Sequence, residues 1–141
     1  MKLVKLLVVT LSAYVGLVVA FESLVGVMGQ RQASRGIQPG ESWLIITTTG
    51  ADGTTRNTVV AGFESGGKLY VSANHWPRGW YHRAVENPDV AIARDGEASA
   101  RRAVSVTGPE LDRITHEYSL PWLIRFLTGF PPRSFLRLDP R

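Results

Sequence analysis

The sequence predicts an α+β fold in which a barrel of antiparallel strands follows an N-terminal hydrophobic helix. Three observations indicate this fold class. The N-terminal stretch is almost uniformly apolar, short β-branched runs then alternate with turns rich in Gly and Asp, and short helical segments lie between those runs. When strands dominate a short chain and helices lie between them, an α+β barrel is favoured over a parallel sheet.

Length, charge and composition narrow the functional classes. The chain has 141 residues, enough for one domain with a buried core, and it has no Cys, which excludes disulfides and Cys-ligated metals but leaves the compartment open. The net charge is +4, but residues 1–40 hold four basic residues and one acidic residue, whereas residues 41–141 hold twelve and eleven. The domain is therefore nearly neutral, and we expect no nucleic-acid partner because such binding needs a continuous basic face.

The N-terminal arm predicts a helix at residues 1–29, followed by a polar linker at residues 30–41 and a domain at residues 42–141. Leu6–Phe21 carries no charge and as a helix spans about 24 Å, slightly less than a ~30 Å hydrocarbon core. Extension to Met28 makes it long enough, with Glu22 near the far interface. Three interpretations stay open: a retained membrane anchor, a signal peptide cut after Ala20, and a helix that lies in the membrane interface.

The domain begins with three expected strands joined by tight turns. The turns at residues 50–53 and 65–67 contain the Gly and Asp residues that tight hairpins require. A helix is expected at Trp80–Asn87, which ends where Pro88 disfavours helical geometry at the residue before it. The expected strands are Ser42–Thr49, Thr55–Glu64, Lys68–Ala73, Val90–Arg94, Ala98–Val106 and Arg133–Leu138.

Two further helices are expected before the last strand. Thr107 and Glu110 have the spacing of a capping box, which predicts a helix that runs to about Tyr118. Pro121–Gly129 predicts a second, short apolar helix. Its apolar residues are interpreted as core, although beside an anchored arm they would also suit a lipid-facing entrance for a hydrophobic substrate.

Residues 72–88 predict a binding wall. This stretch follows the third strand and contains two Trp, one Tyr, two His and two Arg around a Pro and a Gly. So dense a mixture of aromatic and hydrogen-bonding side chains suits a flat ligand better than a core.

Four segments carry a resemblance to a known family. They are Trp43–Gly50, Arg56–Thr58, Leu69–Asn74 and Pro77–Pro88, which together read as a Thr-Thr-Gly strand end, an Arg-Xaa-Thr turn, a Ser-Ala-Asn strand end and a Pro-Xaa-Xaa-Trp-Tyr-His…Asn-Pro element. Over residues 42–138 the chain resembles the deazaflavin-dependent nitroreductase and quinone reductase family. The resemblance implies a split β-barrel, related to the flavin-binding pyridoxamine-phosphate-oxidase-like barrels.

The resemblance also implies a function. It implies an oxidoreductase that transfers a hydride from reduced coenzyme F-420 to a quinone or a nitroaromatic acceptor, and a barrel that forms a homodimer. A membrane-associated chain would suit such an acceptor. The candidate cofactor-binding residues are Thr48, Thr49, Arg56, Asn57, Thr58, Ser72, Ala73, Asn74, Arg78, Trp80 and Tyr81. The catalytic residues stay unassigned, because the cofactor carries the chemistry and the protein needs little acid or base of its own. No metal is expected, because His75 and His82 do not have the spacing of a ligand pair.

One turn departs from the family pattern. The family usually has a Gly-Arg-Lys-Ser-Gly turn whose cations hold the phosphate and acidic tail of coenzyme F-420, whereas here residues 50–53 read Gly-Ala-Asp-Gly. Each lost cation is worth about 1–3 kcal/mol if it is partly desolvated. FMN is therefore kept as an alternative cofactor, and a non-catalytic binding or scaffold barrel is kept as an alternative function.

Structural roles compete with these binding roles. Arg56 can pair with Glu64 or Asp52, and Trp80 and Tyr81 can dock a helix on the barrel. The segment Arg101-Arg102 is interpreted as a solvated strand edge, and the remaining two Trp, Trp43 and Trp122, as core or barrel-rim residues.

The side of the membrane also stays open. More positive charge precedes the apolar stretch than follows it, which places the N-terminus in the cytoplasm and the domain outside. Deazaflavin and nicotinamide cofactors are normally cytoplasmic, so this orientation conflicts with the expected cofactor unless the helix is interfacial or the orientation is reversed.

Overall fold

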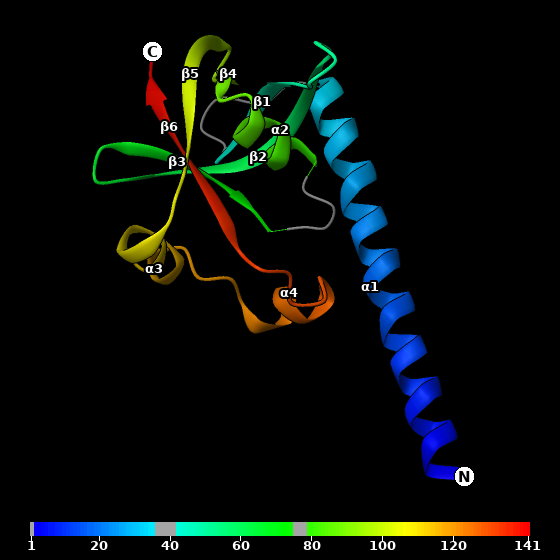
Figure 1. The fold of residues 1–141 in the computed structure, drawn as a ribbon. Helices are drawn as coiled ribbons and strands as arrows, with labels where there is room; N and C mark the ends of the chain where they lie inside the picture. The colour runs from blue at the N-terminus through cyan, green and yellow to red at the C-terminus, as the bar shows by residue number, and fades with distance from the viewer. Residues whose placement is uncertain (1, 36–41, 75–78) are drawn as a thin grey trace.

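The structure is a computed structural model that describes residues 2–35, 42–74 and 79–141 (Figure 1). The elements in chain order are α1 (Lys2–Arg35), β1 (Trp43–Thr49), β2 (Thr55–Ser65), β3 (Lys68–Ala73), α2 (Gly79–Glu86), β4 (Asp89–Arg94), β5 (Glu97–Ser105), α3 (Gly108–Glu117), α4 (Trp122–Leu127) and β6 (Ser134–Pro140).

The six strands form a closed barrel in the order β1-β2-β3-β6-β5-β4, and every neighbouring pair is antiparallel. The predicted meander of the first three strands is present. The last strand, β6, closes the barrel between β3 and β5. The expected α+β barrel after an N-terminal apolar helix is therefore confirmed.

Two apolar clusters lie on opposite sides of the barrel wall. Alternate residues of the strands fill the interior, and those that face away at one side pack beneath α3. On β6, Leu136 and Leu138 belong to the interior cluster while Phe135 belongs to the outer one, as the alternation predicts. The interior cluster comprises Leu44, Ile46, Val60, Val71, Ala84, Val90, Ile92, Ala103, Leu136 and Leu138.

Helix α2 covers one end of the barrel interior. Its Ala84 is fully buried within the interior cluster, and the half-buried rings of Trp80 and Tyr81 pack against the same cluster. Antiparallel register brings the end of β1, the start of β2 and the end of β3 to this end of the barrel. We call this region the α2 end.

The predicted capping box at the start of α3 is wrong. The Thr107 side chain makes no capping hydrogen bond, although α3 does begin at Gly108. Glu110 instead accepts a hydrogen bond from the Tyr70 hydroxyl and pairs with Arg137. A charged partner on the barrel wall has displaced the local bond, because a charge-assisted bond is the stronger one.

Two further interpretations need correction. Arg101 and Arg102 do not lie at a sheet edge, because β5 pairs with β4 on one side and with β6 on the other. The short apolar helix is not mainly core: Trp122 is 66% exposed and Leu123 is 57% exposed. These side chains follow helical spacing, but the barrel already has its own interior and leaves no room for them.

Helix α1 lies beside the barrel and projects past it (Figure 1). It continues to Arg35, six residues into the segment expected as linker, because that segment is rich in helix-forming Gln, Arg and Ala. By length and composition Lys2–Gly29 is apolar enough to cross a membrane, with a mean hydropathy of 2.3 and none of the span buried.

Candidate functional site

The α2 end carries a guanidinium that sequence reasoning missed. Thr48 is the last inward-facing residue of β1 and is fully buried. Arg83, on α2, donates from Nε to the Thr48 hydroxyl oxygen over 3.0 Å. A Cβ built on Gly79 would lie 3.2 Å from Arg83 Nη1, so the guanidinium lies against the first residue of α2. Arg83 is therefore held between a strand end and a helix start.

A second guanidinium, that of Arg56, lies on the same inward face of the barrel wall as Thr48. Arg56 pairs in register with Thr48, and residues directly opposite in antiparallel strands point to the same face. The Arg56 side chain is exposed at the barrel mouth. Two arginines, from β2 and from α2, thus flank the buried Thr48 hydroxyl.

Neither acid that the sequence suggested as a partner of Arg56 forms an ion pair with it, although the Arg56 charge adds to the Thr54 hydrogen bonds that lower the pKa of Asp52. Asp52 accepts hydrogen bonds from the Thr54 amide, at 3.0 Å, and from the Thr54 hydroxyl, at 2.7 Å. Glu64 forms an ion pair with Arg94 at 2.8 Å. Within the described residues neither Arg56 nor Arg83 has an ion pair with a carboxylate. Both guanidiniums therefore have donors to offer an anion.

The other predicted residues divide between the two faces. Ala73 faces the interior, whereas Ser72 shares the outer face with Tyr70 and Phe135. Asn57 accepts a hydrogen bond from Thr47 on the outer face at 2.8 Å. Thr58 is half-buried and belongs, like Arg56, to the inward-facing set of β2, and Thr49 belongs to the outward-facing set of β1. Arg78 lies outside the described residues.

Asn74 belongs to an outer cluster built around Arg133. The Asn74 side-chain amide donates to Ser72 Oγ at 2.9 Å. Arg133 donates to the main-chain carbonyls of Thr115 and Tyr118 at the end of α3, and its guanidinium lies 5.0 Å from the centre of the Phe135 ring. Burial lowers the pKa of Arg133. Arg133 therefore caps the C-terminus of α3, where the helix dipole favours a positive charge.

The aromatic pair on α2 packs on the barrel. The Trp80 and Tyr81 rings meet edge to face with their centroids 6.1 Å apart. Both rings are half-buried against the interior cluster. They hold α2 in place and so fix Arg83, and the remaining exposed part of each ring borders the α2 end.

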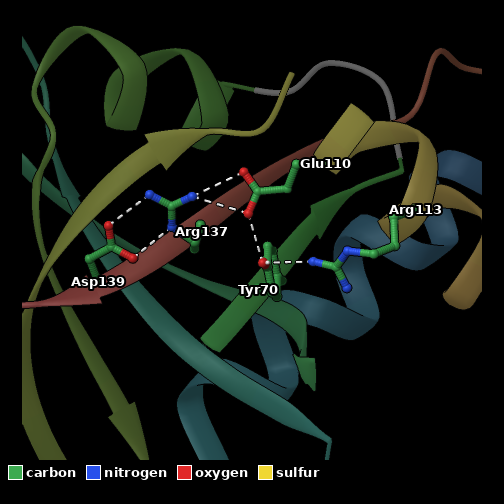
Figure 2. Close-up of polar contacts among 5 residues, drawn as sticks. All are labelled: Tyr70, Glu110, Arg113, Arg137 and Asp139. Carbon is green, nitrogen blue, oxygen red and sulfur yellow. Dashed lines mark hydrogen bonds and ion pairs between the residues drawn. The ribbon is translucent and has the colours of Figure 1, made fainter. Parts of the chain in front are cut away.

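A chain of charged groups ties α3 to the barrel wall (Figure 2). The buried Tyr70 hydroxyl donates to Glu110 Oε1 at 2.8 Å and accepts from Arg113 Nη2 at 3.3 Å. Arg137 contacts both Glu110 oxygens and binds Asp139 through two nitrogens, at 2.8 Å and 3.0 Å. Among the described residues, no buried side-chain nitrogen or oxygen lacks a hydrogen-bond partner, which is typical of a structural network.

The network shifts the pKa values of its members. The hydrogen bond from Tyr70 lowers the pKa of Glu110, and the bonds from Arg137 lower the pKa of Asp139 and are the counterpart of the raised pKa of Arg137. Burial, with the bond to Glu110, raises the pKa of Tyr70, so the phenol stays protonated. The network therefore holds fixed charges at neutral pH and does not move a proton.

Acid should weaken the fold through these two carboxylates. Their pKa values lie below the ordinary 4.5 of Glu and 3.8 of Asp, so the stability they contribute is present above those values and is lost as the pH falls through the folded-state pKa. We expect a melting temperature that is flat above about pH 5 and falls below it. In the double variant E110Q/D139N the fall should be smaller, whereas E97Q, at an exposed carboxylate, should keep the wild-type profile. Equal falls in all three proteins would contradict this.

Metal ligation has no support in the part of the chain that the structure describes. Residues 2–35, 42–74 and 79–141 contain no group of three or more His, Cys, Asp and Glu side chains that could hold a metal ion. His82 and His116 are both exposed.

The fold and the α2 end together define a split-barrel protein with a cationic mouth, suited to a flat cofactor that carries negative charge. The chain matches the family described as "F420H(2)-dependent quinone reductase" over residues 23–122. The chain therefore belongs to the F420H(2)-dependent quinone reductase family. It is an oxidoreductase, and its cofactor is the deazaflavin coenzyme F-420.

Solved structures agree on the fold. A structure described as an F420-H2 dependent reductase (FDR-A) is 21% identical, with a TM-score of 0.56, and the match covers 74% of this chain and 100% of that chain. A domain-swapped dimer is 19% identical, with a TM-score of 0.56 and coverage of 84% and 95%. A pyridoxamine 5'-phosphate oxidase-like protein from Listeria innocua is 11% identical, with a TM-score of 0.50 and coverage of 72% and 85%. No curated protein matches the chain.

The residues of the α2 end fit this cofactor. Coenzyme F-420 carries a phosphate and an acidic tail, and Arg56 and Arg83 offer guanidinium donors that form no ion pair with a carboxylate among the described residues. Arg83 is the residue that could offset the missing basic turn. The sequence could have indicated Arg83, because it follows Gly79 by four residues and so lies one helical turn after the start of α2.

Proposed function

We propose that this chain is a membrane-associated reductase that uses reduced coenzyme F-420 to reduce a quinone drawn from the bilayer. The observation that carries the proposal is the pair of guanidiniums at the α2 end, in a chain of the F420H(2)-dependent quinone reductase family. Bound reduced coenzyme F-420 supplies the hydride. A nitroaromatic is a second acceptor class that the same flat, partly aromatic site would accept.

The residues of the chain bind and orient in this proposal. Arg56 and Arg83 hold the phosphate and the acidic tail, and the Thr48 hydroxyl fixes the direction of the Arg83 guanidinium. Arg83 belongs to the last turn of α2, and its guanidinium reaches back to Gly79, which places its donors beside the start of the helix. Trp80 and Tyr81 keep α2 on the barrel and exclude water from its mouth.

The remaining candidates take supporting roles. Ala73, at the end of β3, is small and faces the interior, which lets a flat ring approach the strand end. Thr49, Asn57, Thr58, Ser72 and Asn74 offer polar groups around the same barrel end, and Arg78 adds a cation to the segment before α2. Two copies of the chain would form a homodimer, as split barrels commonly do.

A direct assay tests the proposal. Under anaerobic conditions, the full chain in detergent micelles that contain a menaquinone should oxidise reduced coenzyme F-420, which is followed by the return of its visible absorbance. Reduced FMN in place of the deazaflavin is the matched control and should turn over far more slowly. Quinone reduction that proceeds equally with both donors, or with neither, would contradict the proposed function.

A further inference from the structure

The surface that α4 shares with α1 carries exposed apolar side chains that the barrel does not use. Trp122 and Leu123 on α4 are mostly exposed, and Phe130 just beyond α4 is 44% exposed. The Trp122 and Phe126 rings stack at 5.2 Å, which presents a rigid aromatic surface. This surface, formed by Trp122, Leu123, Phe126 and Phe130, is called the α4 patch.

The α4 patch is continuous with the apolar helix α1. The Tyr14 hydroxyl donates to the main-chain carbonyl of Phe126 at 3.0 Å, and the two rings lie 4.9 Å apart. A Cβ built on Gly129 would lie 3.0 Å from Val18 Cγ1, so the chain after α4 packs directly on α1. Figure 1 shows α4 beside the middle of α1, with the N-terminal end of α1 projecting beyond it. The α4 patch and the apolar side chains of α1 therefore form one continuous surface and face the same solvent or membrane.

The point of contact limits how α1 can meet a membrane. From Lys2 to Tyr14 the helix rises about 18 Å, well short of a ~30 Å hydrocarbon core. Beyond Tyr14 the helix runs beside the barrel, where Phe21, Glu22 and Val25 are half-buried. If α1 stood upright with α4 at the interface, Lys2 would lie near the middle of the bilayer, where a charge is costly. A helix that lies along the interface returns Lys2 and Lys5 to the headgroups.

The charges near the α4 patch suit an anionic lipid surface. Arg137 is already paired with Glu110 and Asp139, and Arg133 is half-buried at the end of α3, so Arg125 is the cation of residues 119–138 that is available to the patch. Arg125 is exposed, and its guanidinium lies 5.7 Å from the centre of the Phe130 ring. An arginine beside exposed Trp and Phe rings is typical of residues at the headgroup level, where the aromatic rings are partly immersed and the cation stays at the phosphates.

We propose that α1 and the α4 patch together form a monotopic membrane-docking surface for one leaflet, so that the barrel and the N-terminus lie on the same side of the membrane. The occupant of the patch is a bilayer rich in anionic lipid. The inference rests on the membrane association proposed above and adds an orientation. It also removes the conflict over sidedness, because a helix that does not cross the membrane leaves the barrel in the cytoplasm with its cofactor.

Fluorescence labelling tests the immersion of the patch. The chain has no Cys, so the full-length variant Leu123→Cys carries one environment-sensitive fluorophore, and Glu97→Cys at the start of β5 is the control on an exposed turn. On vesicles of phosphatidylcholine and phosphatidylglycerol, the label at position 123 should shift to the blue and be quenched by nitroxide lipids, while the label at position 97 should be quenched by aqueous iodide. A label at position 123 that iodide quenches, or that a second copy of the chain shields from both quenchers, would overturn the proposal.

Two further measurements distinguish a patch that does not bind lipid, a helix that crosses the membrane and a chain that does not bind membranes at all. Trp122→Ala should lower the partition coefficient on these vesicles about tenfold, because the lost side chain contributes apolar area without supporting the fold. A membrane-impermeant maleimide should label Lys2→Cys and Glu97→Cys from the same side of sealed membrane vesicles, and labelling from opposite sides would exclude a monotopic arrangement. A full chain that does not bind vesicles at all would refute membrane association itself, yet would leave the reductase assay untouched.

Discussion

Replacement of Arg56 and Arg83 together by Gln should weaken the binding of coenzyme F-420 by about a thousandfold. A charge-assisted hydrogen bond to an anion is worth about 1.5–3 kcal/mol, or about 10- to 150-fold for each arginine, and the two losses multiply if each arginine binds a different anionic group of the cofactor. Each single variant should therefore lose about 10- to 150-fold. Fluorescence titration of the full chain in detergent measures the dissociation constants.

The design of this experiment isolates the anion. A deazaflavin riboside that lacks the phosphate and the tail should bind the wild type and the double variant with nearly equal affinity. Arg102→Gln, at an exposed arginine of β5, is the matched control and should bind coenzyme F-420 normally. Arg83→Lys should recover only part of the affinity, because an ammonium keeps the charge without the fork of donors. An unchanged dissociation constant in a folded double variant would contradict the role of both arginines.

Arg137→Met should destabilise the fold by about 2–4 kcal/mol, which is the cost of leaving carboxylates without their partner in a partly buried network. Arg137 binds Glu110 and Asp139 at once, and its own side chain is only 20% exposed. Urea denaturation followed by far-ultraviolet circular dichroism measures the change in the free energy of unfolding.

The triple variant R137M/E110Q/D139N distinguishes a lost partner from lost packing. Removal of the two carboxylate charges should restore much of the stability that Arg137→Met loses, because no unpaired charge then remains. Arg102→Met, on the neighbouring strand, should change the free energy of unfolding by less than about 0.5 kcal/mol. If R137M and R102M behave alike, the network of Figure 2 contributes nothing to stability.

The strands could be predicted because their signals are local. β3 begins and ends at the predicted residues, Lys68 and Ala73, since a turn of two glycines precedes it and the Asn74 segment follows. Alternation separates Phe135 from Leu136 and Leu138 on β6, and the structure shows that the two leucines are the residues that face the interior. Hydrophobic period and turn chemistry depend only on neighbours in the chain, so a sequence displays both directly.

The errors arose where a distant residue competes with a local signal. Glu110 had the spacing of a capping box, yet its carboxylate turns to Tyr70 and Arg137, which are far away in the chain. The α4 segment had enough apolar residues for a core, but a closed barrel provides its own interior and leaves Trp122 outside. Closure also converts the expected edge at Arg102 into a paired strand.

The candidate site was predictable as a region and not as a geometry. Resemblance and composition directed attention to Thr48, Arg56 and the segment before α2, and the fold brings the end of β1, the start of β2 and the end of β3 to one end of the barrel. The alternation that puts Ser72 and Ala73 on opposite faces of the wall was available in the sequence, but which face meets the cofactor depends on barrel closure. The roles of these residues stay predictions until binding is measured.

The central claim, that the α2 end holds coenzyme F-420 although the family's basic turn is missing, is tested most directly by equilibrium binding to the wild-type chain. Coenzyme F-420 and FMN are titrated in parallel into the full-length protein by isothermal titration calorimetry. We predict that coenzyme F-420 binds at least tenfold more tightly than FMN, because two guanidiniums meet both its phosphate and its acidic tail. Tighter binding of FMN, or no binding of either, would contradict the claim.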